Sequence, residues 1–187
     1  MAPSWQTNAS ILATVTNLAW AQDSLDIPLF VSLFTQSSPI TFDVSQYHPE
    51  YPSRKVTPPQ LASSLRLALG GFSSTQHILS NPTIRVNDNG REASVKTHVT
   101  AYHFLVDNAE TRDVVSRDEE QEGKFMVNKG TWDVGLIKEN IGGEEKWRIG
   151  KFLVRKVMPV EGETDLYRRA KERASTGHIR GGIGVPT

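Results

Sequence analysis

The spacing of apolar residues predicts helices in the first third of the chain. Apolar residues recur every three or four positions in Ile11, Leu12, Val15, Leu18 and Ala19. This pattern predicts an amphipathic helix for which Asn8 is a suitable N-cap. Asp26 can cap a second helix over residues 27–34, so Asp23 is expected in the short link between the two helices.

A glycine pair marks the change from helices to strands. A third helix is predicted to begin at Thr57 and to run into Gly70 and Gly71. Glycine readily adopts the left-handed conformation that commonly ends a helix. The β-branched and apolar residues that follow favour an extended chain, so His77 is expected near the beginning of a strand.

The rest of the pattern predicts long strands joined by tight turns. Alternating or β-branched residues occur in the segments 38–44, 84–86, 92–106, 125–138 and 147–158. The sequences Asp-Asn-Gly and Asn-Ile-Gly-Gly that separate some of them are typical turns. The acidic segment 107–123 is interpreted as a solvated loop. Helices followed by such a meander indicate an α+β fold, in which helices cover one side of a strongly bent sheet with a pocket on its concave face.

Composition narrows the range of functions. The chain has 187 residues, which fits one domain, and its 21 basic residues balance 21 acidic ones. Without net charge, no global field draws the protein to nucleic acid or an anionic membrane, so a small-molecule partner is expected. The absence of cysteine excludes disulfides, thiolate metal sites and a cysteine nucleophile. No signal-like start or long apolar stretch is present, so a soluble, cytoplasmic protein is the default expectation.

Four short motifs resemble those of the nuclear transport factor 2-like superfamily. They are Leu18-Ala-Trp-Ala-Gln-Asp-Ser-Leu-Asp26, Ser74-Thr-Gln-His-Ile-Leu79, Ala101-Tyr-His-Phe104 and Lys146-Trp-Arg-Ile-Gly150. Within that superfamily the chain is similar to SnoaL-like polyketide cyclases and fungal scytalone dehydratase. The resemblance implies a cone-shaped α+β barrel over residues 1–160, in which three N-terminal helices pack on a strongly curved mixed or antiparallel sheet. Residues 161–187 are then a C-terminal tail, either flexible or a lid over the pocket.

The resemblance also assigns candidate site residues. Asp23 falls on the aspartate position of scytalone dehydratase and His77 on its first histidine. The second histidine has no direct counterpart, although His103 lies on the same strand. Gln22 stands where the dehydratase has a tyrosine. Because of such departures, scytalone itself is not the expected substrate.

A histidine with a carboxylate at one ring nitrogen can move a proton at neutral pH. Asp23 or Asp133 is expected to hold the imidazole of His77 in this way. Thr131 and Asp133 stand where the dehydratase has a serine and an asparagine, and they share one face of a strand. If that face is concave, they meet His77 from across the pocket. The structural alternatives are a core histidine for His77, a helix cap for Asp23 and an outward-facing side chain for Asp133.

The resemblance implies a cofactor-independent lyase or isomerase, a dehydratase or cyclase acting on a small polyketide-like carbonyl compound in fungal-type secondary metabolism. His77, Asp23 and Asp133 are the expected catalytic residues. The expected substrate-binding residues are Trp20, Gln22, Tyr102, His103, Thr131 and Trp132. No metal site is expected, because the histidines do not share a metal-binding spacing.

Two further expectations concern partners. The exposed face of the sheet is expected to support a homodimer or homotrimer, as in relatives with this fold. The rival hypothesis is a non-catalytic member of the same fold that binds a small molecule or forms dimers, because a fold does not fix a function.

Overall fold

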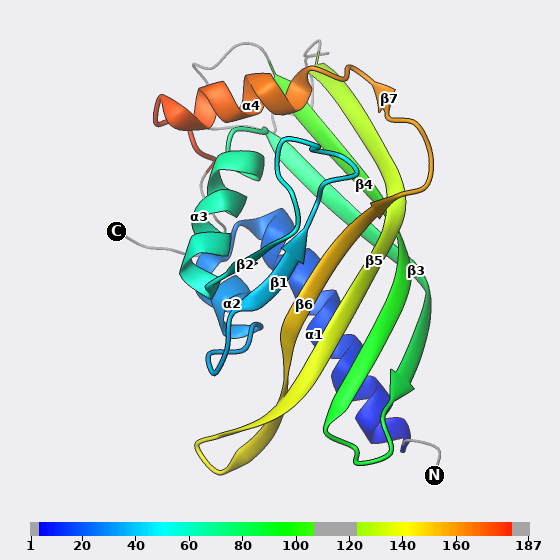
Figure 1. The fold of residues 1–187 in the computed structure, drawn as a ribbon. Helices are drawn as coiled ribbons and strands as arrows, with labels where there is room; N and C mark the ends of the chain where they lie inside the picture. Colours follow the sequence, from blue (N-terminus) through cyan, green and yellow to red (C-terminus); the bar gives the residue numbers. More distant parts are fainter. Residues whose placement is uncertain (1–3, 107–122, 181–187) are drawn as a thin grey trace, which may run out of the picture.

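The computed structural model describes residues 4–106 and 123–180, which form a long curved sheet with helices packed on its inner side (Figure 1). The described helices are α1 (Trp5–Ser24), α2 (Ile27–Ser32), α3 (Pro58–Leu69) and α4 (Leu166–Ser175). The described strands are β1 (Ile40–Asp43), β2 (Arg54–Val56), β3 (Ser74–Val86), β4 (Glu92–Val106), β5 (Gly123–Ile141), β6 (Glu144–Lys156) and β7 (Glu161–Gly162). The predicted acidic loop falls almost wholly outside the described residues.

Side-chain caps fix where the N-terminal helices begin. Ser4, rather than the predicted Asn8, caps α1. Asp26 caps α2 as predicted, because its carboxylate accepts a hydrogen bond from a backbone N–H of the first turn. Thr57 and Gln60 form a capping box at the start of α3. The sequence therefore specifies the helix starts that orient α2 and α3.

The glycine pair after α3 serves close packing rather than a left-handed turn. Gly70 has a φ of −65°, in the right-handed region, so the predicted left-handed end of the helix is wrong. A Cβ atom added to Gly71 would lie 1.8 Å from the carbonyl oxygen of Ala170. Glycine at this position therefore lets α4 approach the joint between α3 and β3.

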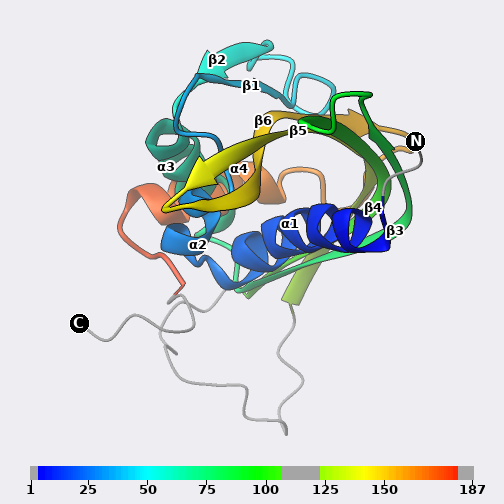
Figure 2. The ribbon, with the colours of Figure 1, turned by 90° about the horizontal axis from the view of Figure 1, so that it is seen from below.

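The sheet is mixed and strongly curved. Its strand order is β2-β1-β6-β5-β4-β3, with β7 paired to β5 at one side. β1 runs parallel to β6, whereas the other pairs are antiparallel. Figure 2 shows the sheet curving around the core, with α1 lying across its open side. The predicted cone-shaped α+β fold is confirmed.

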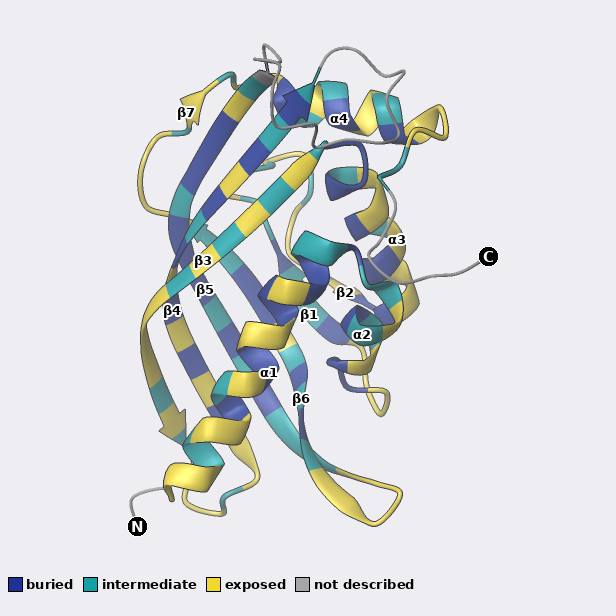
Figure 3. Cartoon of the chain, turned by 180° about the vertical axis from the view of Figure 1, so that it is seen from behind, coloured by how far each residue is buried: buried dark blue, intermediate teal, exposed yellow. Residues whose placement is uncertain are grey.

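Strand alternation decides which side chains face the core. Exposed and less exposed residues alternate along β3 and β4 (Figure 3). The inner face of β4 to β6 carries the buried apolar residues Val95, Val99, Ala101, Leu105, Trp132, Val134, Leu136 and Phe152. His77 is paired with Ala101, so its side chain also points to the inner face.

Helix α4 lies at one end of the sheet, within the residues assigned to the tail (Figure 1). Leu166, Ala170 and Ala174 recur at every fourth position and are all buried. This spacing gives α4 one apolar face, and that face packs with α3 and the end of β5. None of the described helices combines the length and hydropathy required to cross a membrane.

Candidate functional site

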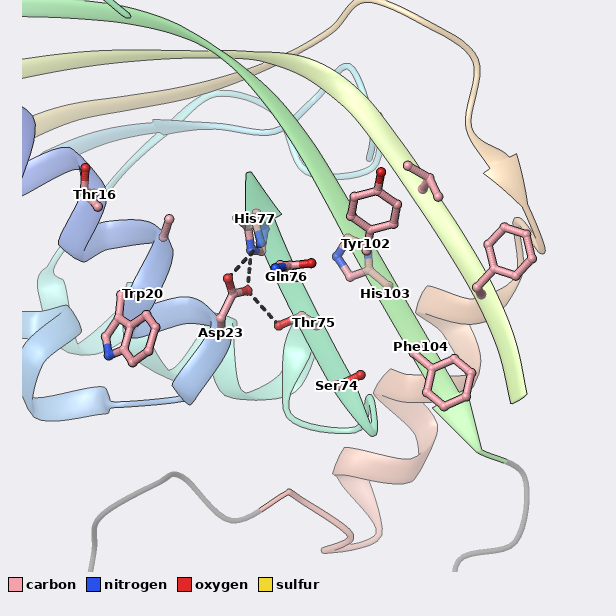
Figure 4. A pocket seen from close by; sticks show the side chains of 13 residues that line it. Thr16, Trp20, Asp23, Ser74, Thr75, Gln76, His77, Tyr102, His103 and Phe104 are labelled. Atoms are coloured by element: carbon pink, nitrogen blue, oxygen red, sulfur yellow. Dashed lines mark hydrogen bonds and ion pairs between the residues drawn. The ribbon is translucent and has the colours of Figure 1, made fainter. Parts of the chain in front are cut away.

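Asp23 and His77 form a hydrogen-bonded pair where the end of α1 meets β3 (Figure 4). Asp23 lies in the last turn of α1, not in a link after it. Nδ1 of His77 lies 2.7 Å from Oδ1 of Asp23, and the backbone N–H of His77 donates to Oδ2 over 2.7 Å. The hydroxyl of Thr75 donates to Oδ1 over 3.0 Å. These contacts fix the carboxylate against one edge of the imidazole.

The protonation of Asp23 determines that of the ring. Burial alone would raise the pKa of Asp23, but the hydrogen bonds and charge of His77 and the bond from Thr75 together lower it below its usual value. The ionised carboxylate can only accept hydrogen bonds, so Nδ1 of His77 carries the proton. Nε2 is then free to accept one, and no described residue hydrogen-bonds to it. The arrangement therefore presents a general base.

The pair borders a hollow of about 720 Å³. Its lining residues are Thr16, Ala19, Trp20, Asp23, Ser74, Thr75, Gln76, His77, Tyr102, His103, Phe104, Phe125 and Val127. Trp20 is 65% exposed and Tyr102 is 44% exposed. Alternation places Gln76 and Tyr102 on the outer face, opposite to Thr75 and His77. The hollow therefore extends from the dyad over the edge strand β3, with mostly apolar walls.

A second polar cluster lies behind the dyad on the inner face. The rings of His77 and His103 are 5.9 Å apart and nearly perpendicular. Nε2 of His103 lies 2.9 Å from the hydroxyl of Tyr167, which also accepts a hydrogen bond from Asn128 over 3.1 Å. Burial, helped by the charge of His77, lowers the pKa of His103 to about 3. His103 is therefore neutral at physiological pH.

Several predicted site residues lie at or near the dyad. Trp20, Tyr102 and His103 line the same hollow. Trp132 is buried on the inner face, and its ring lies 5.5 Å from that of His77. Gln22 is buried in α1 but does not line the hollow.

Thr131 and Asp133 lie away from the dyad. They flank Trp132, whose side chain points inward, so both face the outer side of β5. Asp133 borders a different hollow of about 470 Å³, together with Arg85, Lys96 and Lys151. This corrects the expectation that Thr131 and Asp133 meet His77 across a concave pocket.

Three residues of the site were not predicted. Tyr167 comes from α4, and Asn128 lies on β5, where its amide completes the cluster around His103. Arg180 follows α4, and its guanidinium donates to the hydroxyl of Thr75 over 2.8 Å. The contacts of all three residues join distant parts of the chain, so no local sequence pattern indicated them.

The polar groups of the site suit proton transfer. Within residues 4–106 and 123–180, no group of three or more His, Asp or Glu side chains is arranged to hold a metal ion. Nε2 of His77 can take a proton from a molecule bound against it, and Asp23 would stabilise the resulting imidazolium.

The fold is shared with several solved structures. The protein Kfla4162 from Kribbella flavida is 21% identical with a TM-score of 0.67, covering 87% of this chain and 97% of that one. A Novosphingobium aromaticivorans protein, provisionally named a scytalone dehydratase, is 16% identical with a TM-score of 0.59, covering 98% of this chain and 100% of that one. The hexachlorocyclohexane dehydrochlorinase LinA type 2 is 11% identical with a TM-score of 0.58, covering 84% and 89%. At these identities the likeness shows the fold alone.

Sequence comparison gives the family. No curated protein matches the chain at a significant level. The family model of the SnoaL-like domain matches residues 4–152, which include α1, the whole of β3 and therefore both members of the dyad. The chain belongs to the SnoaL-like domain family, within the nuclear transport factor 2-like superfamily.

Proposed function

We propose that this protein is a cofactor-independent lyase or isomerase that acts on a small, polyketide-like carbonyl compound. The observation that carries the proposal is the Asp23–His77 pair at the edge of the hollow, with Nδ1 tied to the carboxylate and Nε2 left without a partner among the described residues. This is the geometry of a histidine held as a general base.

The reaction follows from the properties of the pair. Nε2 of His77 takes a proton from the carbon next to the carbonyl group, and the electron pair of that C–H bond forms an enolate. Asp23 stabilises the imidazolium formed in this step. The imidazolium then gives its proton either to a hydroxyl group that leaves as water or to another carbon. The first outcome is a dehydration and the second an isomerisation, so the residues present suffice for both.

The walls of the hollow support an aromatic or polycyclic substrate. Trp20 supplies aromatic surface on α1, and Tyr102, Phe104 and Phe125 supply it where the hollow extends over the outer face of the sheet. Gln76 and Ser74 add groups that can hydrogen-bond to a hydroxyl or carbonyl of the ligand. Mostly apolar walls with a few polar groups are typical of small-molecule sites.

The similar structures support the reaction class. Two of them bear the names of a dehydratase and a dehydrochlorinase, which both denote eliminations. Removal of a proton next to the bond that breaks is a common step of such reactions, and it is the step assigned to His77.

Hydrogen exchange in D₂O tests the proposal without knowledge of the natural substrate. Aromatic cyclic ketones and β-hydroxy ketones are incubated with the protein, and deuterium incorporation next to the carbonyl is measured by NMR. The wild type should accelerate exchange for at least one compound, and His77→Ala should lose most of the acceleration. His98→Ala, which changes an exposed histidine of β4, is the matched control and should behave like the wild type. Equal exchange by wild type and His77→Ala would contradict the proposal.

A second function is favoured by the outer face of the sheet. Ile78, Tyr102 and Phe125 are 46%, 44% and 58% exposed, although each is a large apolar or aromatic side chain. Such a surface supports a homodimer or homotrimer, and a non-catalytic dimerisation or small-molecule-binding module. Sedimentation at micromolar concentration should show an oligomer that Phe125→Glu weakens. A monomeric wild type would contradict the homodimer or homotrimer.

A further inference from the structure

The segment after α4 returns to the joint from which β3 begins. The backbone N–H of Arg180 donates to the carbonyl oxygen of Gly70 over 2.9 Å. Ile179 packs against the core, and a Cβ atom on Gly70 would lie 3.0 Å from its side chain. These contacts anchor residues 179 and 180 beside the strand that carries His77.

The side chain of Arg180 joins the two elements that carry the dyad. One nitrogen of its guanidinium, Nη2, donates to the carbonyl oxygen of Gln22 over 3.1 Å. The same nitrogen donates to the hydroxyl of Thr75 over 2.8 Å. Gln22 is adjacent to Asp23 in the last turn of α1, where carbonyl groups need donors and a cation is favourable. Arg180 therefore connects the end of α1 to the beginning of β3.

The chemistry of these groups fixes the direction of each hydrogen bond. A guanidinium can only donate, so Thr75 must accept from Arg180. The single hydrogen of the Thr75 hydroxyl is then available to Asp23, to which it donates over 3.0 Å. A carboxylate that accepts from Thr75 and from the backbone of His77 can hold only one orientation toward Nδ1. Arg180 thus donates to the Thr75 hydroxyl, and the Thr75 hydroxyl donates to the carboxylate of Asp23.

We infer that Arg180 is a positioning residue of the dyad, which acts through Thr75 to hold Asp23 against Nδ1 of His77. This inference rests on the proposed function, since it concerns the same base. Arg180 lies beyond residues 4–152, so the feature is not part of the segment that matches the SnoaL-like domain. The carboxyl-terminal segment therefore completes a site whose reacting groups lie in the family domain.

The charge of Arg180 suits this role. Burial lowers the pKa of its guanidinium to about 10, and the negative charge of Asp23 opposes that change. The side chain is therefore still a cation at neutral pH. A partly buried cation beside Asp23 also favours the ionised carboxylate that keeps the proton on Nδ1.

NMR of the histidine ring nitrogens tests the inference on the full-length protein without a substrate. In protein labelled with ¹⁵N-histidine, a nitrogen that carries hydrogen resonates upfield of one that does not. Wild-type His77 should show protonated Nδ1 and unprotonated Nε2 above neutral pH. Arg180→Gln should shift Nδ1 downfield and Nε2 upfield, toward a mixture of the two tautomers. Arg180→Lys should restore part of the wild-type pattern, because an ammonium can also donate to both oxygens.

A matched control separates positioning from anchoring. Arg173→Gln removes another arginine that donates to a backbone carbonyl, that of Val106, away from the dyad. It should lower the thermal midpoint yet leave the His77 signals unchanged. Thr75→Val breaks the same connection without removing Arg180 and should reproduce the change seen in Arg180→Gln, whereas Thr75→Ser should not. Thr75→Val also provides the answer if Arg180→Gln fails to fold.

The outcomes distinguish this inference from the proposed function. Unchanged His77 signals in both Arg180→Gln and Thr75→Val would show that Arg180 only anchors the chain, and would overturn the inference while leaving the dyad intact. A wild-type ring without hydrogen on Nδ1 would overturn the dyad itself, and the inference with it.

Discussion

Two carboxylates that the sequence places in one site have opposite surroundings. Asp23 accepts hydrogen bonds from a hydroxyl, a backbone N–H and an imidazole. Asp133 has a buried carboxylate oxygen without a hydrogen-bond partner among the described residues. Asp23 faces the inner side of the sheet and borders the larger hollow, whereas Asp133 faces the outer side. The difference shows that a catalytic carboxylate is recognised by the donors that orient it, not by its presence on a suitable strand.

The surroundings also explain the different roles of the two hollows. The Asp23 hollow combines one oriented base with aromatic walls. The Asp133 hollow holds Arg85, Lys96 and Lys151 beside one carboxylate, with no histidine. Proton abstraction next to a carbonyl needs a general base held in one orientation, and the imidazole of His77 supplies it. Only the first hollow has this group.

The largest expected effect comes from exchanging the two carboxylates for amides. Asp23→Asn keeps the shape of the side chain but removes the charge that holds hydrogen on Nδ1 of His77. Deuterium exchange should slow by about 10²- to 10⁴-fold, the usual contribution of general acid–base catalysis. Asp133→Asn is the control, and its exchange rate should remain within a factor of about two of the wild type. The expected change in free energy at this position is far below about 1 kcal/mol. A larger loss in Asp133→Asn than in Asp23→Asn would reverse the comparison.

The next largest effect is a pH dependence of the free energy of unfolding. It should come from His103 on the inner face of β4 and not from a histidine on the outer face. The pKa of His103 is about 6.5 in the unfolded chain and about 3 in the folded protein. At a pH between these two pKa values, the unfolded chain binds more protons than the folded protein does. The free energy of unfolding is therefore highest above the pKa of the unfolded chain and falls as the pH drops toward the pKa of the folded protein. Urea unfolding should show a decrease on the order of a few kcal/mol.

Substitutions on the two faces test the source of that decrease. His103→Gln removes the titrating group from the inner face, so its unfolding free energy should depend less on pH over the same range. His98→Gln removes an exposed histidine from the outer face and should keep the wild-type slope. If both variants have the wild-type slope, the buried imidazole does not cause the acid sensitivity.

A smaller effect is expected from two tyrosine hydroxyls that differ in burial. Tyr167→Phe removes the group that joins His103 to Asn128 and leaves both without that partner. It should lower the free energy of unfolding by about 1–3 kcal/mol, the usual cost of unsatisfied buried polar groups. Tyr51→Phe removes an exposed contact to Lys171 and should change stability by less than about 0.5 kcal/mol. Equal losses in urea unfolding would show that the inner cluster adds no special stability.

Local sequence signals predicted much of the fold. The Asp26 cap, the start of the third helix at Thr57, the tight turns and the alternation of β4 all depend on neighbouring residues, and the structure confirms them. The start of α1 was placed too late because Ser4 competes with Asn8 as a cap. The role of Gly71 could not be seen, because it depends on the close approach of α4 from the far end of the chain.

The site was predicted where alternation and family resemblance agreed. Asp23 and His77 meet as expected. Thr131 and Trp132 could not both point into the pocket, because neighbours on a strand face opposite sides. The register decides the choice, because Trp132 is paired with the inner-face residue Thr97 and its ring lies 5.5 Å from that of His77, so Thr131 and Asp133 face outward. The contribution of Arg180 required knowledge of where the chain returns after α4, which no local pattern contains.

A double-mutant cycle on deuterium exchange tests the central claim most directly, because it asks whether Asp23 and His77 act as one unit. Exchange rates are compared for wild type, Asp23→Asn, His77→Ala and the double variant with one responsive ketone. If Asp23 acts through His77, the double variant should be no slower than His77→Ala alone. Losses that multiply in the double variant would show two independent contributions and would contradict the dyad.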